Sequence, residues 1–579
     1  MNIQQHVATL LTPLVVELGA TDATLADIAF LLAPPRDPSM GDLALPTFKL
    51  AKSAGMAPPA FAAALADRLQ PLMDADPVLC AVTATGPFLN FRQDPVKRTQ
   101  RLLLAVESEQ FGNGTDGVGK TVGLDYSSPN IAKPFGIGHL RSTAIGHALA
   151  RLHAARGYRV VGVNHLGDWG TQFGKLMASY EEFGDATALD ANPIQHLYDL
   201  YVKFHQLAGE DPAWDDRGRD WFRRLEQGDT RAVAYWKQFR DLSLREFERI
   251  YARLDVKFDH YWGEAHYNEM LDDVIRDVEA SGLSQVSDGA LVVPLDDIDL
   301  PPCLIRKSDG ATLYATRDIA AARYRYEQLR FDLFLYVVGA AQTVHFRQVF
   351  EVLARMGEEC APRLVHVPFG LIQGISTRKG TLVFLDDILN RGRDLARQIL
   401  EDRAGLSDSE KDEIAEQVAI GAVIFQDLSR DRIKDYEFDW DAMLRGLRPG
   451  EPGRTGPYLQ YTLVRLTSLL AHYREQRGEI PAAASVDASL LQESETQFLV
   501  HTLEKFPAVV LQAGDSLEPA VLSRYLCDAA EAFNAFYTVH KVVTDDAALT
   551  AARIQLVRGA HRVLYQGLYL LGMPRPTRM

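Results

Sequence analysis

The sequence predicts a multidomain α/β protein, with a parallel-sheet domain at its centre, a small α+β domain before it and an all-α domain after it. Three observations support this prediction. A chain of 579 residues is too long for one hydrophobic core. A strand, a glycine turn, a helix and a second strand follow one another within residues 121–163. From about residue 454 the apolar spacing is helical, with few strand signals, to the end of the chain.

The first domain is expected to span residues 1–115. Helical spacing at the start gives way to turn-rich sequence around residues 34–42, and a helix is expected at residues 61–72. A short strand at residues 88–91 precedes another helix. The glycine-rich segment at residues 111–117 is typical of a linker, so we place a domain boundary there.

The central domain is expected at residues 116–453. Residues 121–125 and 159–163 are short apolar runs typical of buried strands, and residues 140–156 have apolar side chains at helical spacing before Gly157. Further strands are expected at residues 333–338, 364–367 and 381–385, with a helix at 342–356 and a mixed insertion at roughly 180–300. The loop at residues 448–453 marks the boundary with the all-α domain, residues 454–579.

Composition narrows the class of protein. Apolar residues make up 47% and charged residues 24% of the chain, as in ordinary globular proteins. No stretch approaches the roughly 20 apolar residues of a membrane span, and the N-terminal segment lacks a basic leader. The four cysteines form no CxxC pair, so we expect neither a structural zinc site nor a disulfide framework, and we expect a cytoplasmic location.

The net charge of −16 is unusual for a nucleic-acid-binding protein. A local basic surface is nevertheless enough for phosphate contacts. After Asp546 the chain has no acidic residue and five arginines, at positions 553, 558, 562, 575 and 578. Taken alone, this run is better explained as a basic last helix than as a binding surface.

The turn at residues 134–139 could bind phosphate. It opens a helix directly after a strand, and it contains Gly136, Gly138 and His139. Glycines allow close backbone approach to a phosphate, and a helix N-terminus offers unpaired N–H groups. Many tight strand-to-helix turns use glycine for steric reasons alone, so the turn by itself leaves both interpretations open.

The surrounding residues resolve this choice. Residues 127–143, SSPNIAKPFGIGHLRST, resemble the HIGH region of class I aminoacyl-tRNA synthetases, and more narrowly that of the arginyl enzymes. Residues 164–174, NHLGDWGTQFG, are also similar to that family, and the resemblance extends over nearly the whole chain. It implies a Rossmann-type catalytic domain that attaches L-arginine to tRNA(Arg) through arginyl-adenylate, with ATP and Mg²⁺.

Two departures from the family pattern affect the catalytic residues. Gly136 stands where the first histidine of HIGH is usual, and residues 374–380 have Gly374 and Thr377 at the two lysine positions of the KMSKS loop. The resemblance implies that Gly136, Gly138 and His139 bind ATP, with Ser376 and Thr377 of the second loop. The lost positive charge would then come from Lys133, Arg378 and Lys379. The alternative for Lys133 is a solvated surface lysine.

Selection of arginine requires carboxylates for a planar guanidinium. Tyr314 and Asp318 stand at i and i+4, on one face of a helix, and resemble the Y-x-T-R-D segment that binds the guanidinium in this family. Without the resemblance, an ordinary helix start would explain them. Glu264 matches a further acidic position less securely. The resemblance also implies that Asp125, Ser127, Asn130 and Gln342 bind the amino and carboxylate groups of arginine and that His345 lies near the ATP ribose.

The remaining resemblance concerns tRNA. Residues 456–575 are similar to the family's helical anticodon-binding domain, where Tyr458 and Tyr461 could stack on bases and Arg558 and Arg562 could contact phosphate. Packing within the helices is the alternative for at least one of the tyrosines. Residues 1–115 resemble the module that contacts the outer corner of tRNA, and residues 395–453 the stem-contact region. We expect a monomer that does not bind membranes.

Two other classes of protein stay open at this point. A small-molecule nucleotidyltransferase could share the HIGH-type fold, although it would need neither the C-terminal helices nor the pair Tyr314 and Asp318. A tRNA-binding paralogue without catalysis is compatible with Gly136 and the altered second loop. Retention of His139, Lys133 and the arginine pocket favours the enzyme.

Overall fold

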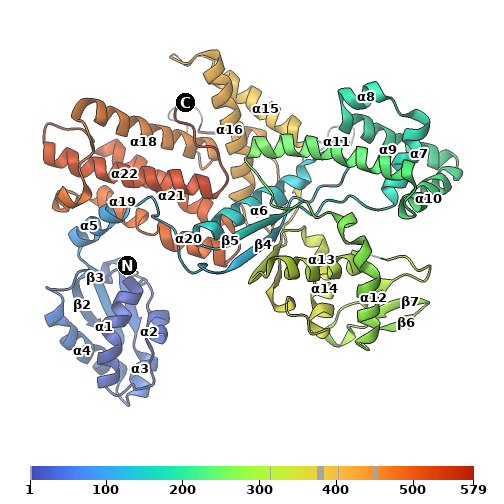
Figure 1. Cartoon of the computed structure of the whole chain (residues 1–579). Coiled ribbons are helices and arrows are strands. Elements are labelled where there is room, and N and C mark those ends of the chain that lie inside the picture. The colour runs from blue at the N-terminus through green and yellow to red at the C-terminus, as the bar shows by residue number, and fades with distance from the viewer. Residues whose placement is uncertain (1–2, 313, 374–383, 402, 404, 447–452) are drawn as a thin grey trace. The chain divides into compact units, whose positions relative to one another are not determined.

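The computed structural model describes residues 3–312, 314–373, 384–401, 403, 405–446 and 453–579 (Figure 1). The chain divides into two compact units. One comprises Met1–Phe111, Ser468–Glu504 and Glu531–Arg562. The other comprises Gly112–Thr467, Lys505–Ala530 and Val563–Met579, and it holds the central sheet.

The central sheet has four parallel strands in the order β10-β9-β4-β5. They are β4 (Thr121–Asp125), β5 (Arg159–Val163), β9 (Leu333–Tyr336) and β10 (Leu364–His366). The register places Asp125 opposite both Val163 and Tyr336, so β4, β5 and β9 end at one edge. The predicted parallel α/β centre is confirmed, and ligands bind at such carboxyl edges in open α/β sheets.

Helix α6 (Ile137–Ala155) follows β4. It begins three residues before the predicted start, because Gly136 already has the extended conformation of an N-cap residue, with φ −82° and ψ 167°. It ends just before Gly157, whose φ of +90° gives the left-handed turn expected there. Gly146 packs tightly on Tyr126, because a Cβ added to it would lie 2.3 Å from the ring.

The inserted segment contains mostly helices and one small antiparallel sheet of order β6-β7-β8. Its elements are α7 (Thr171–Phe183), α8 (Ala186–Ala191), α9 (Pro193–Glu210), α10 (Ala213–Glu226), α11 (Thr230–Leu254), α12 (Leu271–Ala280), β6 (Gln285–Ser287), β7 (Ala290–Val293) and β8 (Cys303–Arg306). The predicted mixed character of this region is confirmed.

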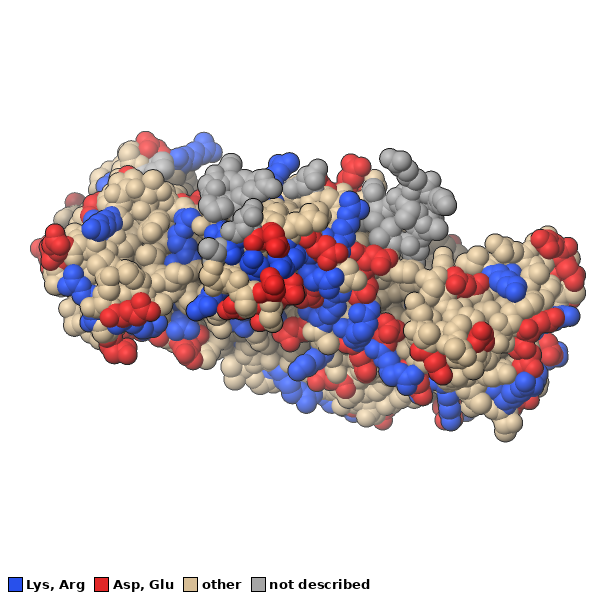
Figure 2. All heavy atoms as spheres, turned by 90° about the horizontal axis from the view of Figure 1, so that it is seen from above, with Lys and Arg blue, Asp and Glu red and all other residues tan. Residues whose placement is uncertain are grey.

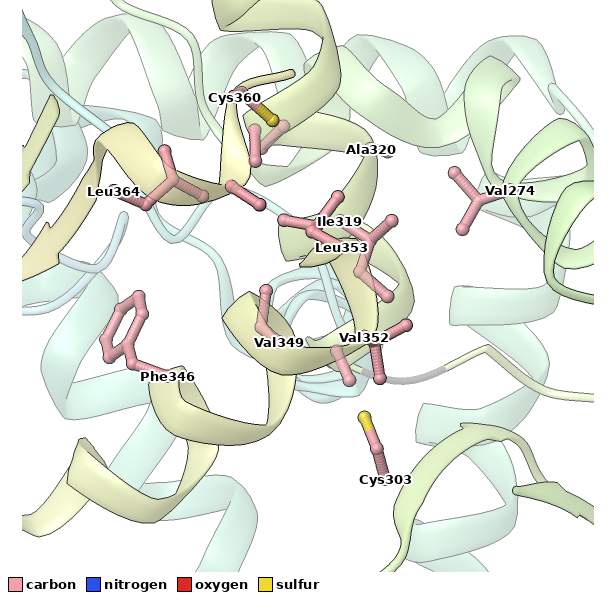
Figure 3. Close-up of a cluster of buried hydrophobic side chains, with 14 of the residues drawn as sticks. Val274, Cys303, Ile319, Ala320, Phe346, Val349, Val352, Leu353, Cys360 and Leu364 are labelled. Carbon is pink, nitrogen blue, oxygen red and sulfur yellow. The ribbon is translucent and has the colours of Figure 1, made fainter. Parts of the chain in front are cut away.

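Helices α13 (Tyr314–Leu329) and α14 (Thr343–Arg355) pack against each other over a common core. Figure 3 shows Ile319 of α13 beside Leu353 of α14, and Ala320 and Val349 belong to the same buried cluster. All four side chains are at most 2% exposed. This core fixes the two helices that bring Asp318 and His345 to the site described below.

The strand predicted at residues 381–385 is wrong where the structure describes it. Residues 381–383 lie outside the described residues, Phe384 forms a single antiparallel bridge with Gly136, and α15 (Leu385–Ile399) begins immediately afterwards. Asp386 and Asp387 stand in the first turn of α15, where the helix dipole favours acidic side chains. The chain continues through α16 (Asp408–Leu428) and α17 (Trp440–Met443), and a short parallel pair joins β11 (Ile372–Gln373) to β12 (Tyr436–Glu437).

The other unit contains the N-terminal sheet, with antiparallel order β1-β3-β2. Its elements are α1 (Ile3–Glu17), α2 (Leu25–Leu31), β1 (Leu43–Pro46), α3 (Phe48–Ser53), α4 (Pro58–Leu69), β2 (Leu79–Thr85), β3 (Phe88–Gln93) and α5 (Pro95–Ala105). The strand expected at residues 88–91 is confirmed as β3, whereas β1 and β2 were not predicted. A register shift between Leu79 and Ala81 interrupts the alternation of β2, which weakens its sequence signal.

The helical pattern predicted from residue 454 onward is confirmed. The helices there are α18 (Gly456–Arg477), α19 (Ser494–Leu503), α20 (Phe506–Asp515), α21 (Pro519–Val539) and α22 (Ala547–Leu570).

Candidate active site

A cavity of about 600 Å³ lies where β4 and β9 end. It brings together residues separated by more than 200 positions in the sequence. Ten of the predicted site residues line it: Asp125, Ser127, Asn130, Gly138, His139, Glu264, Tyr314, Asp318, Gln342 and His345.

The remaining predicted catalytic residues lie elsewhere. Lys133 does not line the cavity, and its ammonium group lies 5.4 Å from the ring centre of Tyr201 on α9. Gly136 contributes the N-cap of α6. Ser376, Thr377, Arg378 and Lys379 of the second loop lie outside the described residues. The chain fixes one flank of that loop, since Leu385 donates its N–H to the carbonyl of Phe135 at 2.9 Å.

The N-terminus of α6 lines the cavity through Gly138 and His139. No side chain caps this terminus, so its first N–H groups are available to a ligand. A Cβ added to Gly138 would meet nothing within 4 Å, so the space beside this glycine is open. Such an arrangement favours an anion.

His139 is uncharged near neutral pH. Burial, together with the positive charge of Lys133, lowers its pKa to about 4, against an opposing effect of the Gly136 backbone. A neutral imidazole has one N–H donor and one acceptor nitrogen. His139 can therefore hydrogen-bond a phosphate oxygen but adds no positive charge of its own.

The segment after β4 has an unusual backbone. Ser127, Ser128 and Ala132 have φ values of +72°, +47° and +59°, which residues with a Cβ seldom adopt. The Ser127 N–H donates to Ser142 Oγ at 2.9 Å, and the Ala132 N–H donates to Ser243 Oγ at 2.9 Å. These bonds hold the strained segment in place, as is common at functional sites.

Two closely packed glycines, one of them within residues 164–174, support the segment after β4. Asn130 forms a parallel bridge with Gly167, and a Cβ on Gly167 would lie 2.1 Å from Asn130 Oδ1. A Cβ on Gly263 would likewise lie 2.5 Å from the Asp168 carboxylate, which accepts the Ala265 N–H at 2.8 Å. Residues 164–174 therefore position both Asn130 and the turn that carries Glu264.

Two carboxylates, those of Glu264 and Asp318, also line the cavity. Asp318 Oδ2 lies 2.6 Å from His345 Nε2, and Tyr314 of the same helix is 67% exposed. Burial raises the pKa of Glu264, as do the charges of Asp168 and Asp318, against opposing effects of His165 and Arg317. Two carboxylates that face one cavity form a site for a cation.

Sequence reasoning missed the main partner of Asp125. Arg325 Nη1 donates to Asp125 Oδ2 at 2.9 Å, and the Ser128 hydroxyl donates to Asp125 Oδ1 at 2.8 Å. Asp125, predicted to bind substrate, thus already has a partner on each oxygen. The spacing offered a signal, because Arg325 follows Asp318 by seven residues and therefore lies on the same face of α13.

The residues predicted to contact tRNA occur in both units. Tyr458 and Tyr461 lie on α18, and the Arg465 guanidinium lies 5.1 Å from the Tyr461 ring centre. Arg558 pairs with Glu107 at 3.3 Å. Arg553 of the basic run is buried and bound to Glu493, so it belongs to the fold.

The described residues contain no group of three or more His, Cys, Asp or Glu side chains placed to hold a metal ion, and the four cysteines are free thiols. Within the same part of the chain, no helix has the length and apolar character needed to span a membrane. Figure 2 shows basic and acidic side chains intermixed on one face of the molecule.

Comparison with known proteins identifies the family. Residues 1–93 match the arginyl tRNA synthetase N terminal domain, residues 102–440 the catalytic domain of tRNA synthetases class I (R), and residues 459–579 the DALR anticodon binding domain. Arginine–tRNA ligase of Clostridium perfringens is 43% identical over 565 residues, covering 96% of this chain and 97% of that protein. Arginine–tRNA ligase 1 of Bacillus thuringiensis subsp. konkukian is 41% identical over 585 residues, covering all of both chains.

Solved structures agree in fold. Arginyl-tRNA synthetase from Plasmodium falciparum matches with a TM-score of 0.80 at 22% identity, covering 100% of this chain and 99% of that one. The Thermus thermophilus arginyl-tRNA synthetase matches with a TM-score of 0.78 at 24% identity, covering 95% and 96%. With these matches over its whole length, the chain belongs to the arginyl-tRNA synthetases, the class I enzymes that attach arginine to tRNA.

Proposed function

We propose that the cavity is the site of arginine activation and that its two ends divide the substrates between them. The observation that carries this proposal is the single cavity that joins an open helix N-terminus to a pair of carboxylates. The arginine carboxylate attacks the α-phosphate of ATP, giving arginyl-adenylate and pyrophosphate. The 3′-terminal ribose hydroxyl of tRNA(Arg) then attacks the acyl carbon and releases AMP.

The acidic end binds the guanidinium of arginine. Glu264 and Asp318 supply negative charge, and Tyr314 lies beside them on the cavity wall. A guanidinium presents donors in a rigid fork that fits a carboxylate, which a lysine ammonium does not. At the other end of the substrate, Ser127, Asn130 and Gln342 bind the amino and carboxylate groups, with Asp125 adjoining them.

The N-terminus of α6 binds the triphosphate. Gly136, Gly138 and His139 contact phosphate oxygens, His345 lies near the ribose, and Ser376 and Thr377 complete the ATP site from the second loop. Lys133, Arg378 and Lys379 stabilise the charge that develops as pyrophosphate leaves. Mg²⁺ would enter as part of the ATP substrate, bound to its phosphate oxygens.

The tRNA is contacted by three parts of a monomeric chain. Residues 1–115 bind its outer corner, residues 395–453 of the catalytic domain (116–453) bind its stem, and residues 454–579 bind the anticodon. Support for the last assignment comes from the match to an anticodon binding domain. Within it, Tyr458 and Tyr461 stack on bases, while Arg558 and Arg562 contact phosphate.

One assay tests the proposal. Bulk tRNA is incubated with ATP and each amino acid in turn, and ATP–pyrophosphate exchange is measured with and without tRNA. We expect charging with arginine alone and exchange that depends on tRNA. Charging with a different amino acid contradicts the assignment of the acidic end, exchange without any tRNA charging indicates a small-molecule nucleotidyltransferase, and tRNA binding without turnover indicates a non-catalytic paralogue.

A further inference from the structure

A buried ion pair between Asp125 and Arg325 lies at the wall of the cavity. Arg325 is 1% exposed at its side chain and Asp125 is 5% exposed. The guanidinium donates to Asp125 at 2.9 Å and to Tyr267 Oη at 3.2 Å. The ring centres of Tyr267, Phe334 and Tyr336 lie 5.8, 5.3 and 5.6 Å from its central carbon. This enclosure excludes water from the guanidinium, so Asp125 is its principal counter-charge.

The pair connects the two parts of the proposed arginine site. Helix α13 carries Tyr314, Asp318 and Arg325 at spacings of four and seven residues, which places all three on one face. Asp125 is the last residue of β4 and also accepts the Ser128 hydroxyl. The ion pair therefore fastens the helix with the guanidinium-binding residues to the segment that binds the amino and carboxylate groups.

We propose that the Asp125–Arg325 pair positions α13 relative to β4. It thereby sets the distance between the residues that bind the guanidinium and those that bind the amino and carboxylate groups, and this distance selects a side chain as long as that of arginine. The inference rests on the proposed function of the cavity. Arg325 is closed off from the cavity and acts through Asp125 and α13. Asp125 has both oxygens occupied within the protein, so its contribution to substrate binding is mainly one of position.

Because the ion pair is buried, its two charges resist separation. Separating the two charges would leave each without a partner in surroundings of low dielectric constant, which is strongly unfavourable. Helix α13 is also held on its other side by Ile319 and Ala320 in the core of Figure 3. Replacing Arg325 should therefore relax the spacing between the two ends, while the residues that touch the substrate stay in place.

The test compares guanidino amino acids of different length. Exchange of pyrophosphate into ATP is measured with the full chain and tRNA for arginine, for homoarginine, which is one methylene longer, and for 2-amino-4-guanidinobutyrate, which is one methylene shorter. A methylene is worth about 10- to 200-fold in discrimination when a site fits closely. We expect Arg325→Met and Arg325→Lys to raise the homoarginine-to-arginine ratio of kcat/KM about tenfold and to leave the KM for ATP within about twofold.

Controls separate positioning from general destabilisation. Arg323→Met, on the same helix, removes ion pairs to Asp277 and Glu358 at the surface and should leave the ratio unchanged. Asp125→Asn combined with Arg325→Met removes both charges together, so it stays informative where the single variant fails to fold. Equal loss of activity with all three amino acids and an unchanged ratio in the folded double variant would overturn the proposal. Wild-type protein that activates none of the three contradicts the proposed function instead.

Discussion

In the proposed function, the α6 terminus and the carboxylates of the cavity recognise charge by different means. The α6 terminus has N–H groups that no side chain caps, a glycine with open space beside it, and a histidine whose pKa is lowered to about 4. The α13 end has Glu264 and Asp318, which come from different parts of the chain and repel each other's charge. A phosphate site can therefore be built from one short segment, whereas a guanidinium site requires carboxylates gathered by the fold.

The largest effect is expected at the α6 end, from Lys133→Ala. If backbone N–H groups and a neutral histidine bind the triphosphate, the charge that forms during the reaction depends on nearby lysine and arginine side chains. Loss of one such group costs about a hundredfold in rate, so tRNA-dependent ATP–pyrophosphate exchange should slow by that factor while the KM for arginine stays within about twofold.

Lys203→Ala is a matched control for that variant. Both ammonium groups lie over an aromatic ring, Lys133 over Tyr201 and Lys203 over Phe183 at 3.4 Å, but only Lys133 precedes the α6 turn. An unchanged exchange rate in Lys133→Ala, or an equal loss in Lys203→Ala, would show that Lys133 is an ordinary surface lysine.

At the α13 end, Asp318→Asn should raise the KM for arginine about thirtyfold. The substitution keeps the size of the side chain and removes its charge, and a hydrogen bond to a charged group is worth about 1.5–3 kcal/mol. The KM for ATP and the exchange rate at saturating arginine should change little. The control is Glu327→Gln, an exposed acidic residue of the same helix. Equal KM values for arginine in the two variants would refute the assignment of Asp318.

Gly138→Ala tests whether the open space at the α6 end is a phosphate site. A Cβ there meets no protein atom within 4 Å, and alanine in a helix is favoured over glycine by about 0.5–1 kcal/mol, so the free energy of unfolding should rise. The KM for ATP should nevertheless increase about tenfold, equivalent to about 1.4 kcal/mol. Gly209→Ala in α9, where a Cβ also meets nothing, should stabilise without affecting ATP. Unaltered ATP kinetics in Gly138→Ala would place the triphosphate elsewhere.

The same contrast explains which parts of the site the sequence could predict. The strand, turn and helix around Gly138 were predictable because their signals are local. Tyr314 and Asp318 were predicted from their i, i+4 spacing and the family resemblance, and both line the cavity. The spacing of Arg325 places it on the same face of α13, but its partner Asp125 lies 200 positions away, and no local pattern identifies that partner. Ser127, Ser128 and Ala132 were not expected in left-handed conformations, because residues with a Cβ avoid them unless the surrounding structure compensates.

The smallest effect is a difference in pH dependence. Burial and two neighbouring carboxylates raise the pKa of Glu264 above its usual value of 4.5. Its folded pKa exceeds its unfolded one, so its contribution to stability is complete below pH 4.5 and is lost as the pH rises through the raised value. Binding follows the opposite trend, because a guanidinium favours the ionised carboxylate. Arginine should therefore bind more tightly as the pH rises through the same range, and the site gains affinity where it loses stability.

The measurement is the KM for arginine between about pH 5 and 7.5 in wild type and in Glu264→Gln. The wild-type KM should rise on acidification, on the order of threefold, and the variant should show a flatter profile because its amide does not titrate. His139 contributes no step in this range, since its pKa is about 4, so the KM for ATP should change with pH equally in both proteins. Identical arginine profiles for the two proteins would mean that the guanidinium does not reach Glu264. Asp318 would then be the anionic partner, and the guanidinium site, like the phosphate site, would draw its charge recognition from one short segment of the chain.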